Sequence, residues 1–131
     1  MLFESELFDR ARCSSLDKGA AARLVPTLYL MAEQARKEGL LSLEADIDLI
    51  EDEFLRWALP LVINGVDPEA VRELLVTRMY SYNYSGAQLL KAMIVSDGVL
   101  AIQAGENPSL TRVRLENYLG PDAEVYRDQP S

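Results

Sequence analysis

The 131-residue chain contains no histidine and only one cysteine, Cys13. The missing histidine removes the commonest general base and the commonest metal ligand, and with them every Ser-His-Asp arrangement. A single cysteine cannot close a disulfide within the chain, and no histidine is present to activate its thiol. We therefore interpret Cys13 as a small apolar core residue, in a pattern of cysteine use typical of cytoplasmic proteins.

Basic residues are also scarce, because 13 Lys and Arg stand against 21 Asp and Glu and leave a formal net charge of −8. Nucleic acids and anionic membranes bind proteins mainly through positive charge, so this balance argues against both as partners. The chain also lacks the segments of a signal peptide and the run of about 20 apolar residues that a membrane span needs. We expect a soluble, cytoplasmic protein without membrane insertion.

Catalytic and metal-binding patterns are missing as well. The densest acidic cluster comprises Asp46, Asp48, Glu51, Asp52 and Glu53. Its spacing differs from that of an EF-hand loop, and no glycine-rich phosphate loop occurs in the chain. An exposed helical face explains the cluster better than a metal site does. A metal-dependent hydrolase stays open as an alternative, but we expect a non-enzymatic protein with no cofactor and no metal.

Helix signals, in contrast, recur along the chain, whereas strand signals are nearly absent. Apolar residues at three- and four-residue steps predict a helix over 25–38, which Gly39 ends, and a second helix over 40–50. A third apolar face over 54–64 contains Pro60. This proline should kink or divide the third helix, because its ring removes a backbone donor.

Two later helices share a start signal. Asp67-Pro68 and Asn107-Pro108 each combine an N-cap side chain with a proline suited to the first turn, and a long helix over about 86–104 lies between them. The sequence therefore predicts the all-α class, as a compact bundle of five or six short to medium helices. We expect one domain over 1–131, with 122–131 as a frayed polar tail.

Tyrosines alternate in the segment MYSYNYSG, residues 79–86. A single strand would have no partner in a helical chain, so we interpret the segment as a loop whose rings cap the core. A tyrosine-rich contact patch is the alternative, since tyrosine is enriched at protein interfaces.

Three stretches carry motifs of a known family. Residues 28–44 read LYLMAEQARKEGLLSLE, residues 61–75 read LVINGVDPEAVRELL, and residues 97–110 read DGVLAIQAGENPSL, followed by 115–121. They resemble, in that order, the ARxxGLLxLE start of the cytoplasmic loop, the LxxxGxDPExxRxxL stretch and the cytoplasmic tail of the flagellar motor stator family MotA. The resemblance covers most of residues 28–121.

The chain departs from that family in its membrane segments. In MotA a pair of membrane-spanning helices separates the second and third stretches, whereas here only about residues 80–86 stand between them. Another membrane pair precedes the loop in the family, and here the polar residues 1–25 stand in its place. The resemblance thus implies a cytoplasmic helical unit without the proton channel, from which ion conduction and torque generation are not expected.

The resemblance also implies a binding site. MotA proteins engage the rotor protein FliG electrostatically through one basic and one acidic residue of this loop, and the matching positions are Arg36 and Glu44. Opposed charges speed encounter and set register, although they add little stability. The alternative is that both charges merely serve the helix ends on either side of Gly39.

We therefore expect a protein-binding module linked to flagellar motility, with Arg36 and Glu44 as binding residues and FliG as the candidate partner. A diverged, free-standing adaptor or a self-associating structural protein, present as a homo-oligomer, is the rival within the interaction class. The metal-dependent hydrolase is the rival from the enzyme class.

Overall fold

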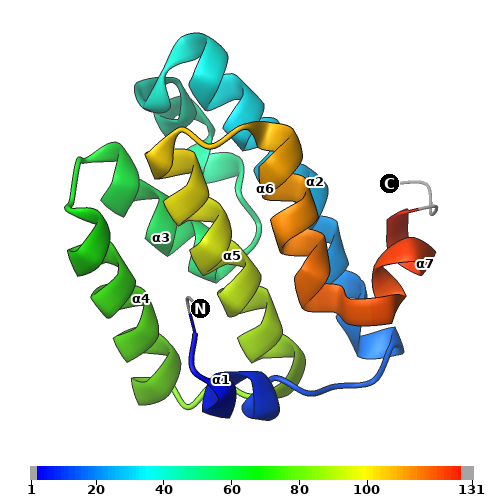
Figure 1. The fold of residues 1–131 in the computed structure, drawn as a ribbon. Helices are drawn as coiled ribbons and strands as arrows, with labels where there is room; N and C mark the ends of the chain where they lie inside the picture. The colour runs from blue at the N-terminus through cyan, green and yellow to red at the C-terminus, as the bar shows by residue number, and fades with distance from the viewer. Residues whose placement is uncertain (1–2, 128–131) are drawn as a thin grey trace.

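A computed structural model describes residues 3–127, and within this range every regular element is a helix (Figure 1). The α-helices are α1 (Ser5–Arg10), α2 (Gly19–Glu38), α3 (Glu53–Ile63), α4 (Pro68–Ser81), α5 (Gly86–Ala104), α6 (Pro108–Glu116) and α7 (Ala123–Arg127). Three 3-10 helices connect them, η1 (Leu16–Lys18), η2 (Leu40–Leu49) and η3 (Asn117–Asp122). The all-α class is confirmed, and the short α7 brings the α-helices in this range to seven where five or six were expected.

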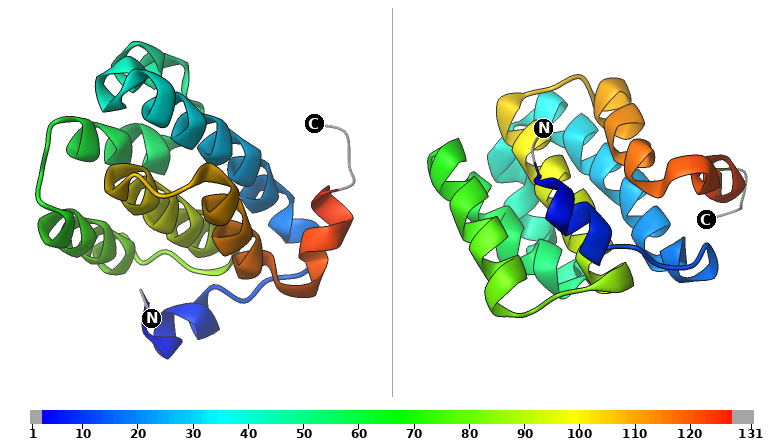
Figure 2. Two further views of the ribbon diagram at one scale, coloured as in Figure 1. Left: turned by 45° about the horizontal axis from the view of Figure 1, so that its top comes forward. Right: turned by 60° about the horizontal axis from the view of Figure 1, so that its bottom comes forward.

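Helix α5 lies at the centre, with α2 and α6 along one side and α3 and α4 along the other (Figures 1 and 2). Gly98, in the middle of α5, permits the close approach of α2. A Cβ atom at this position would lie 2.8 Å from Cδ1 of Leu28, which is itself fully buried. Such a clash would force the two helices apart, because interiors are packed as densely as organic crystals.

Among residues 3–127, α5 alone is long and apolar enough to cross a bilayer by length and composition. In this fold, however, 67% of its apolar stretch is buried inside the protein. The polar residues that interrupt the stretch have partners there: Ser96 Oγ donates to the Ala92 carbonyl oxygen at 2.7 Å, and Asp97 accepts a hydrogen bond from Tyr118. α5 is therefore the core helix of this fold.

Several helix boundaries differ from the predicted ones. α2 begins at Gly19, whereas a start near residue 25 was predicted, and Pro26 therefore lies inside the helix. Residues 40–49 form the 3-10 helix η2 where an α-helix was expected. α3 continues through Pro60, because the apolar face of this helix is buried against α5 and that packing outweighs the lost backbone donor.

The polar tail predicted for residues 122–131 is corrected in part. Ala123–Arg127 form α7, whereas 128–131 lie outside the described residues. Ala123 is buried, the Tyr126 ring lies against Gly19, and Arg127 Nε donates to Glu116 Oε2 at 2.7 Å. These contacts with distant parts of the chain order a segment whose own composition is polar.

Candidate functional site

The two predicted site residues flank the turn between α2 and η2. α2 carries Arg36 in its last turn and ends before Gly39, whose φ of 90° is tolerated by glycine and few other residues. The Gly39 N–H donates to the Ala35 carbonyl oxygen at 2.8 Å, and the chain then turns into η2, which carries Glu44. The structure thus places Arg36 before this turn and Glu44 after it.

Gln34 connects the two arms of the turn. Its Nε2 lies 3.1 Å from the Ser42 carbonyl oxygen and 3.3 Å from both Ser42 Oγ and Asp46 Oδ2. Ser42 Oγ in turn donates to the Gly39 carbonyl oxygen at 2.6 Å, and Leu43 is fully buried. These contacts hold η2 against α2. Sequence reasoning missed Gln34, although an amide and a hydroxyl eight residues apart across a glycine were a usable signal.

Arg36 and Glu44 are both exposed, and within residues 3–127 neither forms an ion pair or a side-chain hydrogen bond. Leu41, between them in the sequence, is 71% exposed. Arg36 lies near the carbonyl end of α2, where a positive charge is favourable, but Glu44 lies in the middle of η2 and serves no helix end. The helix-end interpretation therefore accounts for only one of the two charges.

A second charged group is buried where α5, α6 and η3 meet. Asp97 is 8% exposed; its Oδ2 accepts a hydrogen bond from the Tyr118 hydroxyl at 2.8 Å, and its Oδ1 lies 3.8 Å from Arg114 Nε. Arg114 also donates to both carboxylate oxygens of Glu106, at 2.5 and 3.2 Å. The Tyr118 ring stacks on Phe8 of α1, with centroids 5.9 Å apart. We name Asp97, Glu106, Arg114 and Tyr118 the Asp97 cluster, in which Asp97 is buried and the Arg114 side chain is 44% exposed.

The electrostatics of this cluster follow from its burial. Burial raises the pKa of the Asp97 carboxyl, against the Tyr118 hydrogen bond and the Arg114 charge, which lower it. The hydrogen bond from Arg114 lowers the pKa of Glu106 and raises that of Arg114. Each charge thus has a partner inside the protein, so the cluster joins helices and leaves little for a ligand.

The acidic cluster predicted from the sequence is divided among separate contacts. Asp46 contacts Gln34, as described above. Asp52 Oδ2 caps α3 by accepting from the Leu55 N–H at 2.9 Å, and its Oδ1 lies 3.3 Å from Lys91 Nζ. Within residues 3–127 no group of three or more His, Cys, Asp or Glu side chains could hold a metal ion. The acids that make these contacts act as a cap and as polar partners.

Cys13 is half-buried and packs against the core. Burial raises the pKa of its thiol, which favours the protonated, unreactive form at neutral pH. This environment agrees with the interpretation of Cys13 as an apolar core residue.

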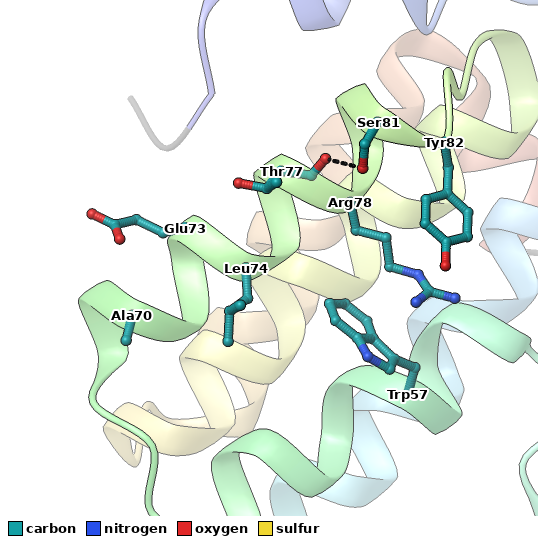
Figure 3. A pocket seen from close by; sticks show the side chains of 8 residues that line it. All are labelled: Trp57, Ala70, Glu73, Leu74, Thr77, Arg78, Ser81 and Tyr82. Atoms are coloured by element: carbon teal, nitrogen blue, oxygen red, sulfur yellow. Dashed lines mark hydrogen bonds between the residues drawn. The ribbon is translucent and has the colours of Figure 1, made fainter.

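Sequence reasoning also missed an open groove of about 490 Å³ between α3 and α4 (Figure 3). Its lining residues are Trp57, Ala70, Glu73, Leu74, Thr77, Arg78, Ser81 and Tyr82. The available signal was the tyrosine run, for which we proposed either a core cap or a contact patch. The tyrosines divide between these two environments: Tyr84 is buried at the core, whereas Tyr80 and Tyr82 are exposed at the surface.

Comparison with known proteins relates parts of this chain to Motility protein A, although no family model matches it. The Treponema phagedenis protein is 46% identical over 52 residues, which cover 40% of this chain and 20% of that protein. The Borreliella burgdorferi protein is 36% identical over 75 residues, 55% of this chain and 29% of that protein. The Bacillus subtilis protein is 35% identical over 69 residues, 50% of this chain and 26% of that protein.

These matches confirm the predicted resemblance as a partial one. The chain spans less than a third of the length of the curated relatives it matches.

Proposed function

We propose that this chain is a non-enzymatic, cytoplasmic protein-binding module, related to the cytoplasmic part of a flagellar stator and linked to flagellar motility. The binding residues in this proposal are Arg36 and Glu44, and the partner is the rotor protein FliG. The partial similarity to Motility protein A supports the link to motility. Similarity to a part of those proteins does not extend to ion conduction, which the resemblance places in other segments.

The proposal rests on a contrast within one turn, between its fixed backbone and its exposed charged side chains. Its backbone is held by Gln34 and by the buried Leu43, while Arg36 and Glu44 stay exposed and have no partner among residues 3–127. Side chains on a fixed backbone lose less conformational freedom when they bind than side chains on a mobile loop. Opposite charges on either side of the exposed Leu41 would attract a partner with complementary charges and would also fix its orientation.

The test measures binding of the full chain to purified FliG from the same organism. Wild type is compared with Arg36→Glu and Glu44→Lys, and with two matched charge reversals at exposed positions elsewhere, Arg23→Glu in α2 and Glu124→Lys in α7. We expect each reversal at the turn to weaken binding about tenfold or more, and each control reversal to change it less than about threefold. Circular dichroism should show equal helicity for all five proteins.

Two results would contradict the proposal in different ways. Absence of wild-type binding would remove FliG as the partner. Equal loss for the turn and control reversals would show that net charge, and not these two residues, governs the contact.

Self-association is the second candidate function, supported by leucines that the fold leaves exposed. Leu16 is 90%, Leu49 78% and Leu30 62% exposed. Apolar side chains at such exposure are often covered in an assembly when they form one patch. Size-exclusion chromatography with light scattering separates the candidates: a stable oligomer that Leu30→Glu or Leu49→Glu dissociates would favour a structural protein, and a monomer would remove this candidate.

A further inference from the structure

Arg78 is held between two aromatic rings in the groove between α3 and α4 (Figure 3). Its guanidinium carbon lies 4.4 Å from the Trp57 ring centroid and 4.3 Å from that of Tyr82. Cation–π contacts on both faces fix the plane of the guanidinium, so that only its edge is left for hydrogen bonds. The side chain is thereby pre-organised.

The hydrogen-bonding capacity of Arg78 is left largely unused. Its Nε is buried without a hydrogen-bond partner, and Nη2 lies 3.9 Å from Glu53 Oε1, beyond hydrogen-bond distance. The Glu53 side chain is 81% exposed, so solvent weakens this ion pair. Figure 3 shows Glu73, the acid that lines the groove, pointing away from Arg78. A carboxylate from outside the chain would therefore meet little internal competition.

The walls beside Arg78 are apolar. Leu74 is 45% and Tyr82 58% exposed, and the Trp57 ring lies between Leu74 and the guanidinium (Figure 3). Trp, Tyr and Arg are the residue types that most often dominate binding energy at protein interfaces. A groove of about 490 Å³ is also within the range of small ligand sites.

We infer that this groove docks a segment of a partner protein that carries a carboxylate beside a bulky apolar side chain. The carboxylate binds the free edge of the Arg78 guanidinium, and the apolar side chain packs on Trp57 and Leu74. Charge-assisted hydrogen bonds to arginine are strong and directional, so they set the orientation of the segment. The site lies on α3 and α4, none of its lining residues belongs to the turn that carries Arg36 and Glu44, and its test is independent of FliG.

Trp57 is the single tryptophan of the chain, so its fluorescence reports directly on the groove. The probes are the capped peptides acetyl-Ala-Leu-Glu-Ala-amide and acetyl-Ala-Leu-Gln-Ala-amide, titrated into the full chain. We expect a saturable change of Trp57 emission with the glutamate peptide and at least tenfold weaker binding of the glutamine peptide, equivalent to about 1.4 kcal/mol. Arg23→Gln, which removes an exposed charge from α2, is the control and should leave both titrations unchanged.

Three variants locate the contact. Arg78→Gln should abolish the preference for glutamate. Glu53→Gln removes the internal competitor and should strengthen binding about threefold, whereas Leu74→Ala should weaken it about threefold. Since Glu53 and Leu74 are exposed, these two variants should fold normally even if Arg78→Gln loosens α3 against α4.

The inference is overturned if neither peptide gives a saturable change, if both bind equally, or if Glu53→Gln and Leu74→Ala leave glutamate binding as it is in the wild type.

Discussion

Asp97, and the pair Arg36 and Glu44, lie in stretches that resemble the same family, yet the two sites differ in burial and in their partners. In the Asp97 cluster, Asp97 is 8% exposed and has partners in Tyr118 and Arg114. At the turn, Arg36 and Glu44 are exposed and without partners within residues 3–127. A matched motif therefore does not show by itself whether a charge supports the fold, whereas its burial and its partners do.

The energetic reason is the cost of desolvation. A charge taken out of water destabilises the fold unless neighbouring groups compensate it, so the cluster is built from several mutual contacts. An exposed charge keeps its hydration and contributes little to folding. The cluster should therefore respond to mutation through stability, and the turn through binding.

The largest effect is expected from Asp97→Ala. The substitution leaves the Tyr118 hydroxyl without a partner and removes one of the two carboxylates near Arg114, which keeps Glu106, and this should lower the free energy of unfolding by about 1–3 kcal/mol. Urea denaturation followed by circular dichroism measures it. Asp97→Asn keeps an acceptor for the Tyr118 hydroxyl and should lower the free energy of unfolding by less than Asp97→Ala does. A loss below that of a typical surface mutation would show that the cluster holds no helices together.

A smaller effect is expected from pH. Because the pKa of Asp97 in the folded protein is raised above its unfolded value of about 4, the folded state holds this proton more tightly than the unfolded state does. The stabilising contribution of protonation is complete below about pH 4 and is lost as pH rises through the raised pKa. Relative to Asp97→Asn, the wild type should therefore lose stability from about pH 4 upward and reach a constant difference above the raised pKa.

Urea denaturation of both proteins at intervals between about pH 4 and 7 measures this difference. A difference independent of pH would mean that Asp97 titrates as an exposed carboxyl.

The smallest effect on stability is expected at the turn, and its size sharpens the comparison with Asp97. Arg36→Glu and Glu44→Lys should each change the free energy of unfolding by less than about 0.5 kcal/mol, because neither removes a contact within the described fold. Thermal unfolding by circular dichroism is the measurement. A loss above about 1 kcal/mol would restore the helix-end interpretation, in which the charges support the turn itself.

Local signals predicted the parts of the fold that local interactions determine. Asp67 Oδ2 accepts from the Glu69 N–H at 3.1 Å, and Asn107 Oδ1 accepts from the Ser109 N–H at 2.8 Å, so α4 and α6 begin where their N-caps were predicted. The end of α2 at Gly39 was also predicted from a local signal. Residues within one turn of each other make these contacts, and their spacing is visible in the sequence.

The remaining differences depend on distant contacts. α7 forms because Tyr126 packs beside Gly19, and α3 passes through Pro60 because its apolar face is covered by α5. At the candidate site, the motif identified Arg36 and Glu44, but their exposure and the clamp made by Gln34 required the fold. The groove around Arg78 forms between α3 and α4; the tyrosine run indicated a contact patch as one alternative, but the pairing of Arg78 with Trp57 required the fold.

The aromatic contact between Phe8 and Tyr118 brings the first and the last quarters of the chain together. During synthesis on a ribosome, α1 and α2 emerge early, yet Tyr118 and α6 emerge only after the apolar α5. Helices α2, α3 and α4 precede α5 and can pack against it as it emerges, whereas the side of α5 that contacts α6 stays uncovered until α6 follows. This order exposes α5 to chaperones, aggregation and lipid in the interval. A chain shortened before α6 would leave that side of α5 exposed.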